Sequence, residues 1–171
     1  MSLSHRPVEA LDLPVICGFA QGEEELFFFF PKARYPLTAE QLQGSIDQRS
    51  DSTVVELDGE VVGFANFYQW EQGGTCSIGN VVIAPHVRGR GVGAYLVRLM
   101  VRLARERHQA SEVRLSCFNL NLAGLLFYPK LGFVPYGIEE RQDFKGRRVA
   151  LIQLRWAGSH TDSANQAESG R

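Results

Sequence analysis

The segment Ile78-Gly-Asn-Val-Val-Ile-Ala-Pro-His-Val-Arg-Gly-Arg-Gly-Val-Gly-Ala94 predicts a strand, a glycine-rich turn and the start of a long helix. Gly89, Gly91 and Gly93 let the backbone approach a ligand closely and adopt positive φ angles where the turn requires them. The helix that follows directs its free N–H groups and the positive end of its dipole at the same place. Arg88 and Arg90 add positive charge. The segment therefore predicts a cradle for a pyrophosphate.

Three phosphate motifs compete for this turn. A P-loop ends in Gly-Lys-Ser/Thr, which Val92-Gly93-Ala94 does not supply. Gly89–Ala94 fits the dinucleotide spacing Gly-x-Gly-x-x-Gly/Ala, but such a turn follows its strand directly and needs an acid after the next strand. Here Pro85–Arg88 intervene, and the next predicted strand ends at Phe118-Asn119. The coenzyme A turn, (Gln/Arg)-x-x-Gly-x-(Gly/Ala), matches Arg88–Gly93 at every fixed position; a purely structural turn is the remaining alternative.

A second motif follows about 30 residues later, Asn121-Leu-Ala-Gly-Leu-Leu-Phe-Tyr128-Pro-Lys-Leu-Gly-Phe133. It combines an Asn, small residues, a Tyr seven positions after the Asn, and then Leu-Gly-Phe. In this order and on elements of these types, the two motifs resemble the GNAT superfamily of N-acetyltransferases. The resemblance covers roughly residues 52–156 and extends more loosely to the N-terminal helices.

The resemblance implies an α/β (α+β) fold, the GNAT fold. Its sheet is mixed and largely antiparallel, with about six to seven strands, a splayed central pair and about four flanking helices. It also implies a single acetyltransferase domain over residues 1–156. Residues 157–171 are polar and poor in apolar residues, so we expect a disordered tail there.

Local patterns predict the individual elements. Strands are expected over 52–57 and 60–68, joined at Asp58-Gly59, and then over 75–83, 112–118, 134–140 and 147–156. Helices are expected over 11–20, 92–109 and 121–131, and from Thr38, which has capping-box spacing to Gln41. The first residues predict a disordered start over 1–4 and a short strand over 5–10.

The resemblance also assigns cofactor contacts. The pantetheine arm of coenzyme A would pair with the backbone of Val81, Val82 and Ile83, and one N–H of this strand would polarise the thioester carbonyl. The pyrophosphate would bind the amides of the turn, and Asn121 would hydrogen-bond the pantetheine arm. Gly124 would let the cofactor approach its helix. Lys130 would reach a phosphate, although a solvated lysine explains it equally well. The proposed cofactor set is Val81, Val82, Ile83, Arg88, Gly89, Arg90, Gly91, Val92, Gly93, Ala94, Asn121, Gly124, Tyr128 and Lys130.

Tyr128 is the catalytic residue that the resemblance implies, as the group that protonates or hydrogen-bonds the departing thiolate. A phenol of pKa about 10 is a weaker acid than a thiol of pKa about 8.5. Full proton transfer is therefore uphill by roughly 2 kcal/mol unless the site changes both groups. Stabilisation of the thiolate charge is the better description of this role.

The acceptor side is less well defined by the sequence. Family members often carry a glutamate base at positions that correspond here to Ser77 and Ser116, and neither serine is a base at neutral pH. Ordered water, Glu71 or the carboxylates of residues 23–25 could take the proton instead. Glu23, Glu25 and Tyr68 are the proposed substrate contacts, since carboxylates and aromatic rings suit a cationic acceptor.

Bulk properties exclude several functional classes. A net charge of −1 argues against a nucleic-acid-binding protein, despite the arginines between Arg88 and Arg114. No apolar run approaches the roughly 20 residues that span a membrane, and no signal peptide is evident. The three cysteines lack Cys-x-x-Cys spacing, which predicts reduced thiols in the cytoplasm and no metal site.

These observations favour an enzyme that moves acetyl from acetyl-CoA to a primary amine by direct attack in a ternary complex. A small-molecule acceptor is expected rather than a peptide, because nothing resembles a peptide-docking surface. The absence of the usual glutamates keeps an alternative open, a CoA-binding sensor with little turnover. A homodimer is compatible with the family, but the sequence marks no interface.

Overall fold

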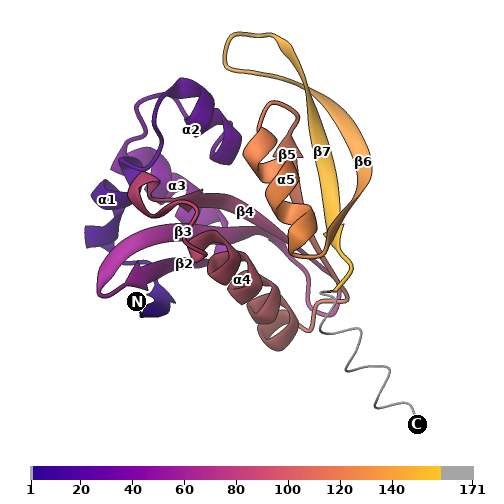
Figure 1. Cartoon of the computed structure of the whole chain (residues 1–171), viewed down its shortest axis with the longest axis horizontal. Coiled ribbons are helices and arrows are strands. Elements are labelled where there is room, and N and C mark those ends of the chain that lie inside the picture. The colour runs from indigo at the N-terminus through magenta and orange to yellow at the C-terminus, as the bar shows by residue number, and fades with distance from the viewer. Residues whose placement is uncertain (1, 159–171) are drawn as a thin grey trace.

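Seven strands form a single sheet in the order β1-β2-β3-β4-β5-β7-β6. The computed structural model describes residues 2–158 (Figure 1). Neighbouring strands are antiparallel except β4 and β5, which are parallel. The strands are β1 (Leu3–Pro7), β2 (Ser50–Leu57), β3 (Glu60–Trp70), β4 (Thr75–Ile83), β5 (Glu112–Phe118), β6 (Phe133–Gln142) and β7 (Arg148–Trp156).

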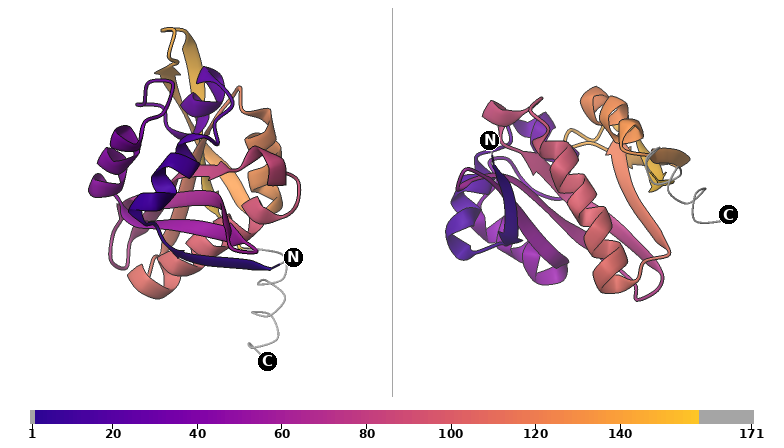
Figure 2. Two further views of the ribbon diagram at one scale, coloured as in Figure 1. Left: turned by 90° about the vertical axis from the view of Figure 1, so that its left-hand side faces the viewer. Right: turned by 60° about the horizontal axis from the view of Figure 1, so that its bottom comes forward.

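Helices cover both faces of this sheet (Figures 1 and 2). One face carries α4 (Val92–His108) and α5 (Leu122–Lys130), and the other carries α1 (Leu13–Cys17) and α3 (Ala39–Gln48). The helix α2 (Glu23–Phe29) links the two halves of the sheet, because it contacts β4 and also stacks Phe27 on Phe118 of β5 at 4.3 Å between ring centroids. Short 3₁₀ turns at Ala10–Asp12 and Pro85–Val87 complete the described elements.

The expected α/β fold with a mixed, largely antiparallel sheet is confirmed. The strands β4 and β5 have the predicted bounds, and α4 differs by one residue at its end. At the β2–β3 turn, Asp58 and Gly59 both have positive φ angles, 50° and 86°, as a tight hairpin requires. Thr38 caps α3 by accepting a hydrogen bond from the N–H of Gln41 at 3.3 Å.

The prediction for the first strand is wrong in two respects, and the helix expected over 11–20 covers only Leu13–Cys17, after a 3₁₀ turn. The first strand is Leu3–Pro7 rather than residues 5–10, and residues 3 and 4 are ordered rather than disordered. Pairing with β2 explains both differences, since Leu3 lies opposite Leu57 and the strand ends where Pro7 pairs with Thr53. The predicted tail over 157–171 lies outside the described residues from position 159 onward.

The two central strands separate soon after they begin. They pair only where Thr75–Ser77 meet Glu112–Arg114, and beyond this point β4 and β5 diverge (Figure 1). The antiparallel pairing of β4 with β3 continues to Ile83, and that of β5 with β7 continues to Phe118. The second half of β4 therefore has one edge that pairs with no other strand of the described chain.

A β-bulge interrupts β4 at the same level. Phe64 pairs with Val82 and Asn66 with Gly79, so two steps along β3 oppose three along β4. The extra length is accommodated at Asn80, whose φ is 52° and whose side chain is buried. Its amide donates to the Phe29 carbonyl at 2.8 Å and accepts from Ser45 Oγ at 2.8 Å and from Asn66 Nδ2 at 3.1 Å. The bulge is thus tied to α2, α3 and β3.

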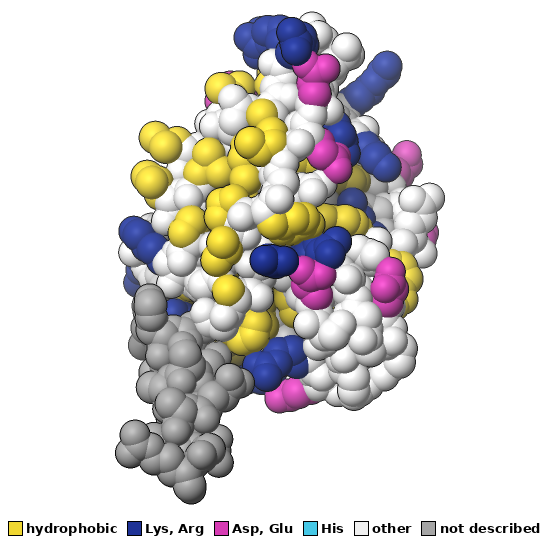
Figure 3. Space-filling view, turned by 90° about the vertical axis from the view of Figure 1, so that its right-hand side faces the viewer, with side chains coloured by type: hydrophobic (Ala, Val, Ile, Leu, Met, Phe, Trp, Pro, Cys, Tyr) yellow, Lys and Arg dark blue, Asp and Glu magenta, His cyan; other side chains and the backbone are white. Residues whose placement is uncertain are grey.

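A face of α5 and β6 exposes several apolar side chains (Figure 3). Leu122, Leu126 and Ile138 are 65%, 60% and 73% exposed. Exposure alone does not show that a second copy of the chain binds here, so the homodimer stays a prediction. No helix within residues 2–158 combines the length and the apolar character that a membrane crossing needs.

Replacing Asn80 with alanine should lower the free energy of unfolding by about 2–4 kcal/mol. The variant removes one hydrogen bond from each of three polar groups, of which Asn66 Nδ2 keeps a longer bond to Ser52 Oγ at 3.4 Å, and it places an alanine at a positive φ angle. Asn80→Gly removes the same hydrogen bonds without the backbone strain, so it should be the less damaging of the two. Urea unfolding of both variants measures the difference, and equal stability of Asn80→Ala and the wild type would contradict this account.

Candidate functional site

The glycine-rich turn leads directly into α4. Gly89 and Gly91 have φ angles of 78° and 85°, which side-chain-bearing residues rarely adopt, and neither has a neighbour that a β-carbon would meet. The first hydrogen bond of the helix runs from the Tyr95 N–H to the Gly91 carbonyl at 3.1 Å. The N–H groups of Val92, Gly93 and Ala94 consequently precede the helical ladder and are available to an anion.

Gly93 serves a different purpose from the other two glycines. A β-carbon built on it would lie 3.2 Å from Cζ of Phe127 and 3.7 Å from Cγ1 of Ile83. Its small size therefore allows the start of α4, the end of β4 and α5 to meet. The two sequence motifs are brought together at this contact.

Arg88 has intramolecular partners at the start of the turn. Its Nε donates to the Ile83 carbonyl at 3.1 Å, and its Nη2 donates to the Phe19 carbonyl at 3.3 Å and to the Glu25 carboxylate. The side chain thereby fixes the turn to the end of β4, to the segment before α2 and to α2 itself. Arg90, Gly89 and Lys130 are exposed, so a phosphate can approach them.

Tyr128 lies on α5 with its side chain turned into the protein. It is 9% exposed and packs edge-on against Phe133, with ring centroids 6.1 Å apart. Burial, followed by the proximity of Cys117, raises the pKa of the phenol above its ordinary value. Tyr128 is therefore protonated across the whole range in which an amine can be assayed.

Asn121 begins α5 as its N-cap, with Oδ1 accepting the N–H of Gly124 at 3.1 Å. A β-carbon on Gly124 would lie 2.8 Å from both Asn121 Nδ2 and Cys117 Sγ. Gly124 is thus needed for packing of the helix on β5, a reason that the sequence did not reveal. The Nδ2 group of Asn121 has no hydrogen-bond partner within residues 2–158.

The backbone of Val81–Ile83 borders the opening between β4 and β5. Val82 and Ile83 pair with Phe64 and Gly63 of β3, while their other side faces the gap. A strand edge of this kind offers alternate N–H and carbonyl groups to an extended ligand. The structure places these residues, the turn and α5 around one opening.

The acceptor-side residues are more dispersed. Ser77 is buried and donates to Gln69 Oε1 at 2.9 Å, and Gln69 in turn donates to Glu71 at 2.7 Å. Ser116 pairs with Gln153 of β7, across the opening from β4. An amide can polarise Ser77 toward Glu71, but it does not carry a proton between them.

The side chains proposed for a cationic acceptor also make contacts within the protein. Glu23 is exposed in the first turn of α2, where a negative charge stabilises the helix dipole, and Glu25 pairs with Arg88. Tyr68 is 45% exposed and lies beneath the guanidinium of Arg49, 5.5 Å from its ring centroid.

Three polar residues near β4 were not predicted from the sequence: Arg49, Asn66 and Asn80. For Asn80, the available signal was a polar residue inside the otherwise apolar run 78–83. Asn66 carries the same signal inside the apolar run 61–67, whereas Arg49 carries none, because only the folded chain brings it beside Asn66 and β4.

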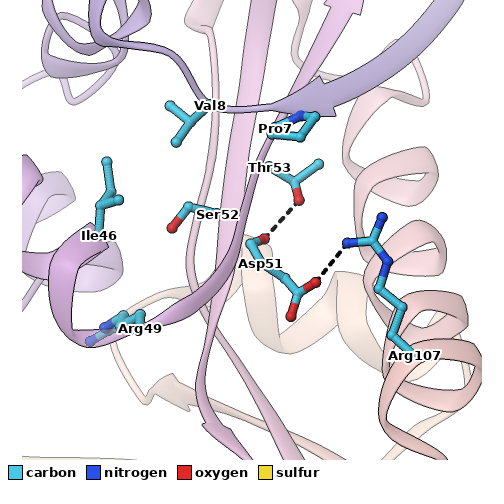
Figure 4. Close-up of a pocket in the computed structure, with 8 residues that line it drawn as sticks. All are labelled: Pro7, Val8, Ile46, Arg49, Asp51, Ser52, Thr53 and Arg107. Carbon is cyan, nitrogen blue, oxygen red and sulfur yellow. Dashed lines mark hydrogen bonds and ion pairs between the residues drawn. The ribbon is translucent and has the colours of Figure 1, made fainter.

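A separate hollow lies beside α3 and the start of β2. It has a volume of about 330 Å³, and Figure 4 shows Asp51 inside it, directed at Arg107. The carboxylate of Asp51 accepts from Arg107 at 2.8 Å and from His108 at 2.7 Å. No group of three His, Cys, Asp or Glu side chains suited to a metal ion occurs within residues 2–158.

Comparison with protein families identifies this arrangement. The family model described as the acetyltransferase (GNAT) family matches residues 19–133, about two thirds of the chain. The chain belongs to the GNAT family. GNAT acetyltransferases use acetyl-CoA, which one similar structure contains.

Known GNAT proteins resemble the chain in sequence or in fold. The streptothricin acetyltransferase of Streptomyces lavendulae is 34% identical over 87 residues, which are 50% of this chain and 44% of that enzyme. The chain thus matches less than half of that relative. The spermidine N-acetyltransferase of Vibrio cholerae, solved with CoA and spermine, superposes with a TM-score of 0.75 at 18% identity, covering 90% of this chain and 94% of that one.

A third GNAT protein confirms the fold. The ribosomal-protein-alanine N-acetyltransferase of Brucella melitensis has a TM-score of 0.72 at 21% identity and covers 89% of this chain and 98% of that one. At such low identities, the two structural similarities concern the fold alone.

Gly124→Ala should destabilise the protein by about 1–3 kcal/mol. The added methyl group would overlap Cys117 and Asn121, which are part of a packed core and an N-cap. Gly44→Ala is the matched control, because Gly44 lies in α3 with no atom near the new methyl group, and it should stabilise by about 0.5–1 kcal/mol. Thermal unfolding distinguishes the two; similar shifts in both variants would contradict the packing role of Gly124.

Proposed function

We propose that this GNAT protein transfers acetyl from acetyl-CoA to the primary amine of a small molecule, by direct attack in a ternary complex in the cytoplasm. The observation that carries the proposal is the opening between β4 and β5, bordered by the glycine-rich turn before α4 and by α5, the helix that carries Tyr128. The three free thiols among the described residues are compatible with a reducing compartment. A relative named for streptothricin supports an amine acceptor.

The cofactor would lie along the opening with its two ends held differently. Its phosphates would bind the N–H groups of Val92, Gly93 and Ala94 at the start of α4, where the dipole favours an anion. Its pantetheine arm would pair with the free edge of β4 at Val81–Ile83, and Asn121 Nδ2 supplies a donor from the facing helix. When bound, acetyl-CoA supplies an activated acetyl group as a thioester.

The residues of β4 would assist the attack on this thioester. A backbone N–H just after the bulge at Asn80 is oriented by a rigid set of buried hydrogen bonds, so it can stabilise negative charge on the carbonyl oxygen without reorganising. The amine nitrogen forms the new C–N bond and loses a proton, while the C–S bond breaks and the thiolate leaves.

Tyr128 would stabilise the departing thiolate. Since burial raises the pKa of its phenol, donation of a whole proton is more unfavourable than the roughly 2 kcal/mol expected for unperturbed groups. A hydrogen bond from the phenol to the sulfur does not carry this cost. Ordered water is the proposed acceptor of the amine proton, because the resemblance assigns Ser77 and Ser116 to positions where family members often carry a glutamate.

Tyr128→Phe should lower kcat at least tenfold and leave the Kd of acetyl-CoA almost unchanged. The phenol acts on charge that develops only during the reaction, and phenylalanine keeps the packing against Phe133. Release of CoA thiol across polyamines, amino sugars, amino acids and peptides gives the rates. Tyr35→Phe, at an exposed position, is the control. Full activity of the Tyr128→Phe variant would show that the Tyr128 hydroxyl takes no part in the reaction. Tight CoA binding by the wild type without turnover of any amine would favour the CoA-binding sensor.

Gly91→Val should weaken acetyl-CoA binding about tenfold or more. Valine disfavours the φ angle of 85° and places a branched side chain where the phosphates would approach. Gly59→Val introduces the same strain at a φ angle of 86° in the β2–β3 hairpin, also without neighbours. Isothermal titration should therefore show an affinity loss in Gly91→Val only; an equal loss in both would indicate a general effect of destabilisation.

A further inference from the structure

Arg49 lies against the backbone of β4 immediately before the bulge. A β-carbon built on Gly79 would be 2.5 Å from Arg49 Nη1 and 2.7 Å from Cδ1 of Tyr68. The guanidinium and the ring therefore cover a stretch of strand that has no side chain of its own. Arg49 Nη1 also donates to Asn66 Oδ1 at 3.2 Å, and its guanidinium stacks over Tyr68.

The charge of Arg49 is not neutralised by a carboxylate within residues 2–158. Asp51, two residues later, is engaged instead by Arg107 (Figure 4) and by His108. Burial lowers the pKa of the Arg49 guanidinium, while Tyr68 opposes this effect, so the site already disfavours the positive charge. Other arginines do have carboxylate partners: Arg6, Arg88, Arg107, Arg114, Arg141, Arg147 and Arg148.

A second arginine on the same side of the sheet has an unsatisfied donor. Arg114 of β5 pairs in register with Ser77, and Ser77 and Gly79 project to the same face of β4 because side chains alternate along a strand. Although Arg114 Nη2 binds Glu112 at 2.5 Å, its Nε is buried and has no partner within residues 2–158. Buried donors of this kind are rare and call for an explanation.

Negative charge, in contrast, is scarce at this place. Glu25 is neutralised by Arg88, and Glu71 is reached from Ser77 only through Gln69. The charged group that lies against Gly79 is therefore the partly buried guanidinium of Arg49, which also lines the hollow beside α3 together with Asp51 and Arg107. A polyamine would be repelled there, whereas an anion would supply the missing partner.

We propose that Arg49 binds a carboxylate of the acceptor, so that the preferred substrate is a small amine that also carries an acidic group, as amino acids do. The inference rests on the proposed function. Gly79 and Val81 are two residues apart, a span of at most about 7 Å in an extended strand. Arg49 lies against Gly79 and the thioester would lie beside Val81, so the carboxylate and the attacking amine of the acceptor would be separated by only a few bonds.

The test compares amino acids with their carboxamides as acceptors. Removing the carboxylate charge lowers the pKa of the neighbouring ammonium, so without charge recognition the carboxamides would react faster. The wild type should instead favour at least one amino acid over its amide. Arg49→Met should lower kcat/KM for that amino acid about 10- to 100-fold, the loss expected for a charge-assisted hydrogen-bonded pair, and should leave the amide rate and the Kd of acetyl-CoA unchanged.

Two further variants serve as controls. Arg49→Lys keeps the charge but loses the planar fork, so it should fall between the wild type and Arg49→Met. Arg98→Met makes the same replacement at an exposed position of α4 and should have no effect. Thermal unfolding of each variant checks that the fold is retained.

The outcomes separate this inference from the proposed function. Equal or better acetylation of amides and polyamines, or equal losses on both acceptors in Arg49→Met, overturns the role of Arg49 and leaves the acetyltransferase proposal standing. If nothing is acetylated, titration of amino acids into the protein with CoA decides: binding that Arg49→Met abolishes sustains the inference, and absence of binding overturns it.

Discussion

The buried hydrogen bonds of Asn80 fix the geometry on which the site depends. They hold a bulge with a left-handed residue in the middle of β4 and connect it to α2, α3 and β3. Without the bulge, residues 81–83 would be displaced by one position, and their N–H groups would point to the other edge of the strand. A single amide side chain thus sets which backbone donors face the opening.

The opening itself results from how little β4 and β5 share. Three residue pairs join the strands, and β5 then follows β7 while β4 follows β3. Apolar contacts replace the missing strand pairing: α4 buries Leu96 and Met100 on one face, and Phe27 of α2 stacks on Phe118 beyond the gap. The two halves of the sheet therefore stay together although β4 and β5 do not pair beyond these three residue pairs.

Local patterns were sufficient for most of the fold. Strand alternation and the glycine-rich turn located β4, α4 and β5 because these elements carry their own start and stop signals. The first strand was misplaced because its bounds depend on pairing with β2, a contact between distant residues. Contacts between distant residues also limit what the sequence predicts about the site. Arg88 was expected to hold phosphate, and its bonds to Phe19 and Glu25 become visible only when the N-terminal segment is in place.

The three cysteines have a practical consequence for enzymology. Burial raises the pKa of all three thiols, that of Cys117 to about 11. At neutral pH the thiolate fraction of Cys117 is on the order of 10⁻⁴, and thiolates are the species that attack disulfide reagents. A chromogenic disulfide added to count liberated coenzyme A would therefore report the product with little background from the protein.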